Sequence, residues 1–129
     1  MKIIPILKAE EKTAGGRVYS LSAFENAYNR ILWHTKIPFK THDRSGYPKD
    51  IKLLKKDDII VDKQNKTLSV KLEDSDTMGL YGLSLAPEIC VEKVRKIDKD
   101  SVLIEDFTIE GIQATQDLCS FKSIDSIVK

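Results

Sequence analysis

Residues 59–72 read I-I-V-D-K-Q-N-K-T-L-S-V-K-L and predict a β-hairpin. Residues 59–62 form a short apolar β candidate, and residues 63–66 (K-Q-N-K) form a polar turn. Residues 67–72 then alternate apolar and polar side chains, which is the pattern of a strand with one buried face. The hairpin therefore places β-structure near the middle of the chain.

Further strand patterns lie on both sides of this hairpin. They cover residues 2–8, 17–19, 51–54, 80–86, 89–97 and 102–114. Pro87 is expected to end the segment 80–86, and residues 73–79 (E-D-S-D-T-M-G) are expected to form an acidic loop. The pair Gly15 and Gly16 suggests a positive φ angle or a close approach of two backbones. The final residues, 116–129, have weak periodicity that fits either a helical turn or a strand.

One helix is predicted, over residues 22–33. Ser22 followed by Glu25 matches a capping box, in which each side chain caps the first turn. Apolar residues then recur at helical spacing and form one stripe: Phe24, Ala27, Tyr28, Ile31 and Leu32. Pro38 prevents the helix from running much further.

The expected fold is mainly β with one early α-helix (α+β), as a small β-barrel or sandwich covered by the helix at about 22–33. A chain of 129 residues fits a single domain, 1–129. The formal net charge is +1 and the two signs are interspersed, which argues against binding nucleic acid or a membrane surface through bulk charge. The apolar runs are too short to span a bilayer, so no membrane partner is expected.

No metal or cofactor site is predicted. Residues 74–79 resemble the start of a calcium loop, but Met78 occupies the fifth position and Leu85 the twelfth, where a glutamate is needed. The histidines and cysteines have no zinc-binding spacing. Cys90 and Cys119 are expected to be reduced thiols, although a bridge between them is compatible with the sequence.

His42 and Ser84 are candidate catalytic residues. His42 lies where an apolar extended segment gives way to a polar turn, a position that fixes the backbone and leaves the imidazole reachable. A serine hydroxyl becomes a good nucleophile when an imidazole takes its proton and a third group holds that imidazole. Four later residues are candidates for this third group: Glu105, Asp106, Glu110 and Gln113. The competing interpretation is that Ser84 is a small residue that hydrogen-bonds locally within its strand.

The order of four segments resembles the tailed-phage prohead maturation proteases, which have the herpesvirus-assemblin-like serine protease fold. Residues 16–19 (G-R-V-Y) before the helix are similar to the family's N-G-R-x-Y-P opening. Residues 38–46 (P-F-K-T-H-D-R-S-G) resemble P-x-L-W-x-H-D-x-x-x-P-I-G. Residues 83–85 (L-S-L) match the nucleophile segment, small-x-S-I-G or V-S-x-R. Residues 107–114 (F-T-I-E-G-I-Q-A) match a late strand, L-x-E-x-S-L-V or L-x-G-I-D-L-V.

The resemblance implies a serine endopeptidase that cleaves capsid or scaffold proteins in the phage prohead or virion, within the host cytoplasm. His42 would be the base and Ser84 the nucleophile. Glu110 would be the third member in one register of the late strand, and Gln113 would take its place in the other. Two alternatives stay open: a non-catalytic capsid auxiliary or decoration protein with the same fold, and a small β-barrel binding module. A homo-oligomer is compatible with each of these.

Overall fold

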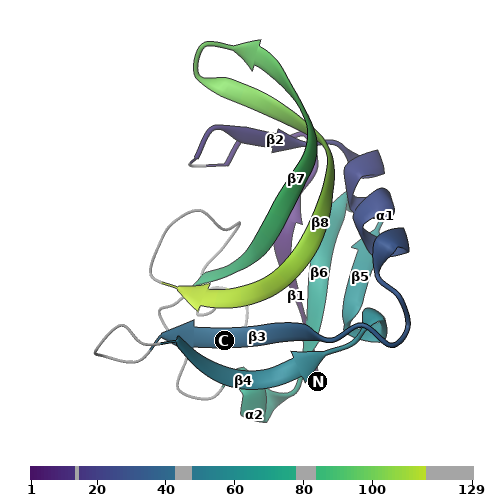
Figure 1. The fold of residues 1–129 in the computed structure, drawn as a ribbon, viewed down its shortest axis with the longest axis vertical. Helices are drawn as coiled ribbons and strands as arrows, with labels where there is room; N and C mark the ends of the chain where they lie inside the picture. The colour runs from purple at the N-terminus through teal and green to yellow at the C-terminus, as the bar shows by residue number, and fades with distance from the viewer. Residues whose placement is uncertain (14, 43–47, 78–83, 116–129) are drawn as a thin grey trace.

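The structure is a computed structural model that describes residues 1–13, 15–42, 48–77 and 84–115. It contains two β-sheets and one main helix (Figure 1). The smaller sheet is antiparallel, in the order β1 (Lys2–Lys8), β6 (Thr67–Leu72), β5 (Ile59–Asp62). The larger sheet contains β2 (Arg17–Tyr19), β3 (Ile37–His42), β4 (Pro48–Leu54), β7 (Ser84–Asp98) and β8 (Ser101–Thr115). The helical elements are α1 (Leu21–Arg30), η1 (Lys56–Asp58) and α2 (Asp74–Thr77).

Strand β8 organises the larger sheet. It pairs along its whole length with β7, and the two form a long curved hairpin (Figure 1). Its other edge is shared by two short parallel strands, because β2 pairs with residues 102–104 and β3 pairs with residues 112–114. Helix α1 connects β2 to β3 and packs against the stretch of β8 between them.

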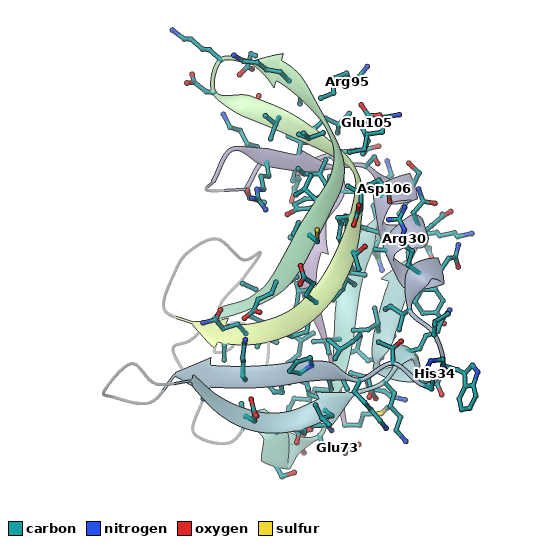
Figure 2. The ribbon with its side chains drawn as sticks, in the orientation of Figure 1. Arg30, His34, Glu73, Arg95, Glu105 and Asp106 are labelled. Carbon is teal, nitrogen blue, oxygen red and sulfur yellow. The ribbon has the colours of Figure 1, made fainter. Side chains whose placement is uncertain are left out.

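Three aromatic rings fix the helix on the sheet. The ring of Phe24 from α1 lies 6.3 Å from that of Phe107 in β8, and Tyr19 of β2 lies 5.5 Å from Phe107. Phe24 and Phe107 are fully buried. Edge-to-face packing of this kind adds to the stabilisation from buried apolar area. The guanidinium of Arg30, at the end of the helix, binds the carboxylate of Asp106 (Figure 2) and donates to the backbone oxygen of Phe107 at 3.0 Å.

The helix differs from its expected bounds at both ends. Its N-cap is Ser20, whose hydroxyl accepts a hydrogen bond from the amide of Ala23 at 3.1 Å, so the expected capping box at Ser22 is not formed. The helix ends at Arg30 because Ile31 adopts an extended backbone. Leu32 is therefore not part of the buried stripe, and it is exposed together with Trp33.

The predicted hairpin at residues 59–72 is confirmed as β5 and β6. Two other expectations were wrong. The strand that begins at Ser84 continues through Pro87, which is tolerated because β7 is an edge strand within the described chain and needs no amide donor on its outer side. The acidic segment contains a short helical turn, α2, in place of an open loop.

The mainly β, α+β fold class is confirmed. One core is shared by both sheets and α1, and it contains residues such as Ile4, Leu68, Phe39 and Ile112. The sheets stay separate and do not close into a barrel among the described residues, so the barrel alternative is not realised. Residues 80–83 of a predicted strand, the turn residues 43–46 and the segment 116–129 with Cys119 lie outside the described residues.

Candidate active site at one end of the larger sheet

The candidate base and nucleophile lie at the same end of the larger sheet. His42 is the last residue of β3, whose Thr41 pairs with Ala114 of β8. Ser84 is the first residue of β7 and pairs with Thr115 of β8. β3 and β7 therefore flank the last residues of β8, as the neighbouring strand ends in Figure 1 show. Two strand spacings separate the backbones of His42 and Ser84, which is about 10 Å.

Two residues back from this end of the sheet, the same three strands carry side chains that the structure describes. Lys40 of β3 pairs with Gln113 of β8, and Gln113 pairs with Ala86 of β7. The Lys40 ammonium lies 3.1 Å from the carboxylate of Glu88 in β7, so this ion pair crosses β8. Both side chains are only partly exposed. The pair joins the strand that ends with His42 to the strand that begins with Ser84.

Gly111 makes room for this ion pair. It pairs with Glu88 in the β7–β8 ladder, and a Cβ atom at this position would lie 3.3 Å from a Glu88 carboxylate oxygen and 3.3 Å from the carbonyl oxygen of Pro38. A side chain there would press on both neighbouring strands. A small residue at this point therefore allows Lys40 and Glu88 to meet over β8.

Three of the four candidates for the third catalytic role lie far from this end. Glu110 is the extra residue of a β-bulge, since Glu88 pairs with Gly111 and Ile89 with Ile109. It precedes Thr115 by five residues, which is about 17 Å along an extended strand. Glu105 and Asp106 lie further back, at about 30 Å from the end of the strand.

Glu105 and Asp106 also have other partners. The Glu105 carboxylate lies 3.5 Å from the Lys93 ammonium and 3.3 Å from the Arg95 guanidinium. Asp106 is bound by Arg30, and the hydrogen bonds from that guanidinium lower the pKa of the Asp106 carboxyl. Both acids therefore serve contacts that fix the hairpin and α1.

Gln113 is the candidate nearest to the end of β8. It precedes Thr115 by two residues, about 7 Å along the strand, and its backbone lies between those of Lys40 and Ala86. The sequence reasoning missed Lys40 and Glu88. Lys40 could have been found from its spacing, because it precedes His42 by one strand period, whereas the partnership with Glu88 depends on the pairing of three strands.

The described residues contain no group of three or more histidine, cysteine, aspartate or glutamate side chains that could hold a metal ion. Cys90 is a free, exposed thiol whose pKa is raised, chiefly by the nearby carboxylate of Glu92. A raised pKa disfavours the thiolate, which is the reactive form. Cys90 is therefore a poor nucleophile in this setting.

No family model matches the chain, and neither a curated protein nor a solved structure shows significant similarity to it. In the part of the chain that the structure describes, no helix has the length and apolar character needed to cross a membrane.

Proposed function

We propose that this protein is a serine endopeptidase of the prohead-protease type, which cleaves capsid or scaffold proteins during phage head maturation. The observation that carries the proposal is the strand register that puts His42 and Ser84 on either side of the end of β8. A nucleophile and its base must lie within reach of each other, and two backbones at the same end of a sheet are compatible with that requirement.

In this mechanism the Ser84 hydroxyl attacks the scissile carbonyl carbon while the imidazole of His42 takes its proton. The imidazolium then gives that proton to the leaving amine, and a water molecule hydrolyses the resulting ester with the same imidazole as base. Gln113 is the candidate best placed along β8 to orient the imidazole by a hydrogen bond. As a neutral group it would hold the ring without stabilising its positive charge, so we expect a slow enzyme.

The test is cleavage of a co-expressed capsid or scaffold protein, or of the chain itself. We expect wild type to cleave and Ser84→Ala and His42→Ala to lose cleavage, while Ser69→Ala, a serine in the other sheet, retains it. Equal cleavage by wild type and Ser84→Ala would exclude the endopeptidase.

A second function is favoured by the position of the acids. Because Glu105 and Asp106 are bound by cations elsewhere and Glu110 lies on a bulge, no carboxylate among the proposed residues lies near His42. A non-catalytic capsid auxiliary protein would keep the fold without a charged third member. It would be recovered intact and in fixed stoichiometry on mature particles, whereas a maturation protease would be lost.

A further inference from the structure

A groove runs between helix α1 and the edge of the smaller sheet. Its volume is about 490 Å³, within the range of ligand sites. One wall contains Tyr28 and Asn29 of α1, and the other contains Ile60 and Val61 of β5. β5 is the outer strand of the order β1-β6-β5, and α1 lies beside it (Figure 1). The groove thus follows a strand edge that has no neighbouring strand among the described residues.

The backbone of Val61 faces this groove. The amide of Ile59 donates to the carbonyl oxygen of Lys56 and so points away from β6. In an antiparallel pair the N–H and C=O of one residue point to the same side, and the side alternates along the strand. The backbone groups of Ile60 therefore bond to β6, and those of Val61 point to the free edge. Within the described chain, no turn or loop backbone supplies a hydrogen bond to Val61.

These features specify the chemistry of an occupant. An N–H and C=O pair on a free strand edge is satisfied by another extended backbone, which adds as a further strand. The side chain of Ile60 and the ring of Tyr28 supply an apolar surface. Tyr28 packs against the core, and the ammonium of Lys56 lies 4.7 Å from the centroid of its ring.

One acid of the groove that is unpaired within the described chain, Asp57, favours a basic residue at one position of the occupant. The Glu25 carboxylate at one end lies 3.7 Å from the Lys63 ammonium. Asp57 at the other end is exposed and has no ion pair within the described residues. An uncompensated carboxylate at this end would attract a lysine or arginine.

We propose that the groove between α1 and β5 binds an extended peptide segment of a partner protein. The segment adds antiparallel to β5, places apolar side chains over Ile60 and Tyr28, and places a basic side chain beside Asp57. This site lies at the helix side of the molecule, away from the strand ends that contain His42 and Ser84 (Figure 1). The groove would bind a partner protein whether or not the chain is an endopeptidase.

The long edge of β7 is a weaker template for the same kind of pairing. It bears Lys93 and Arg95, and the ladder it forms with β8 is interrupted by several register shifts. Charged side chains and bulges are the features that keep sheet edges from pairing with other chains. The groove edge at β5 has three consecutive apolar residues, Ile59, Ile60 and Val61, and its described pairing with β6 has no register shift.

The experiment selects binders from a displayed library of random seven-residue peptides against the full chain, and then measures affinities of the synthesised peptides. Val61→Pro removes the amide that faces the groove without removing a bond to β6. Asn29→Tyr fills the groove from the exposed face of α1. Asn26→Tyr is the matched control, because Asn26 lies on the side of the same helix that faces the hairpin.

We expect selected peptides to combine apolar residues with a lysine or arginine. Their affinity should fall about tenfold or more with Val61→Pro and with Asn29→Tyr, and stay unchanged with Asn26→Tyr. Asp57→Lys should lower the affinity of the peptides that contain a lysine or arginine more than that of other peptides. If Val61→Pro does not fold, Asn29→Tyr decides the outcome. A selection that yields no peptide sensitive to Asn29→Tyr would overturn the proposal.

Discussion

Gly16 shows how a single residue connects the start of the larger sheet to the hairpin turn. Its φ angle is +80°, and a Cβ atom there would lie 2.5 Å from the backbone oxygen of Asp100. Its own carbonyl oxygen accepts a hydrogen bond from the amide of Val102 at 3.0 Å. A side chain would therefore strain the backbone and push the turn away at the same time.

We predict that Gly16→Ala lowers the free energy of unfolding by about 2 kcal/mol or more. Urea denaturation followed by circular dichroism measures this. Gly15→Ala is the control, because the nearest atom to its added Cβ would be 3.9 Å away and Gly15 has no positive φ. If both substitutions lowered the free energy of unfolding equally, the contact of Gly16 with the hairpin turn would not be the cause.

Asp106 makes the stability of the protein depend on pH. Its pKa is lowered by the hydrogen bonds from Arg30, so the folded state holds the proton less tightly than the unfolded state does. The carboxylate therefore stabilises the fold above its unfolded pKa of about 3.9, and this contribution is lost as the pH falls through the lower folded value.

We predict that Asp106→Asn is less stable than wild type at pH 7 and that the difference narrows below about pH 4. Thermal unfolding of both proteins, from about pH 2 to about pH 7, measures the difference in stability between them. A difference that stays constant over this range would show that Arg30 gains nothing from the charge of Asp106.

At the scale of the element, helix α1 offers a test of its observed start. The hydroxyl of Ser20 caps the amide of Ala23, and the hydroxyl of Ser22 lies 3.1 Å from the Ser20 hydroxyl. We predict that Ser20→Ala destabilises the protein by about 1 kcal/mol. Ser22→Ala should cost clearly less in the same denaturation experiment. If Ser22→Ala were the more destabilising substitution, the result would support the capping box at Ser22 that the sequence predicts.

The elements also show what a sequence pattern can and cannot determine. The alternation of residues 67–72 sufficed to predict β6 as a strand, but it predicted one buried face, and the structure also buries Thr67 and Ser69 on the other face. The end of α1 and the strand through Pro87 depended on partners: Ile31 turns away to reach β3, and β7 lies at a sheet edge. Local propensity carries no information on such partners.

At the scale of the molecule, burial divides the fold into a stable and a less stable part. Strand β6 lies between two strands and is almost fully buried, whereas residues 94–98 of β7 are exposed near the hairpin tip. We predict that amide hydrogens of residues 94–98 exchange by local opening, well before those of β6. Native-state hydrogen exchange by NMR measures both. Matching exchange free energies would indicate that the hairpin opens only with the whole molecule.

The candidate site was partly predictable from local sequence patterns. Sequence motifs marked His42 and Ser84. The strand end at His42 followed from the apolar segment before it, whereas Ser84 was expected inside the strand 80–86 and is the first residue of β7 in the structure. The third member could not be selected because Glu105, Asp106, Glu110 and Gln113 share one strand. Which of them lies near the strand end depends on pairing and on the bulge at Glu110.

The two short strands on one edge of β8 have a consequence for the order of folding. β2 and β3 pair with a strand that follows them by more than half of the chain: Arg17 pairs with Val102, and Phe39 with Ile112. During synthesis β3 can pair with β4, but the edges of β2 and β3 that face β8 stay unpaired, and α1 stays without its packing surface on β8, until β8 emerges. Such distant pairing slows folding. We expect nascent chains that stop before residue 101 to be digested readily by protease within residues 17–42, and longer chains to become resistant there in a single step.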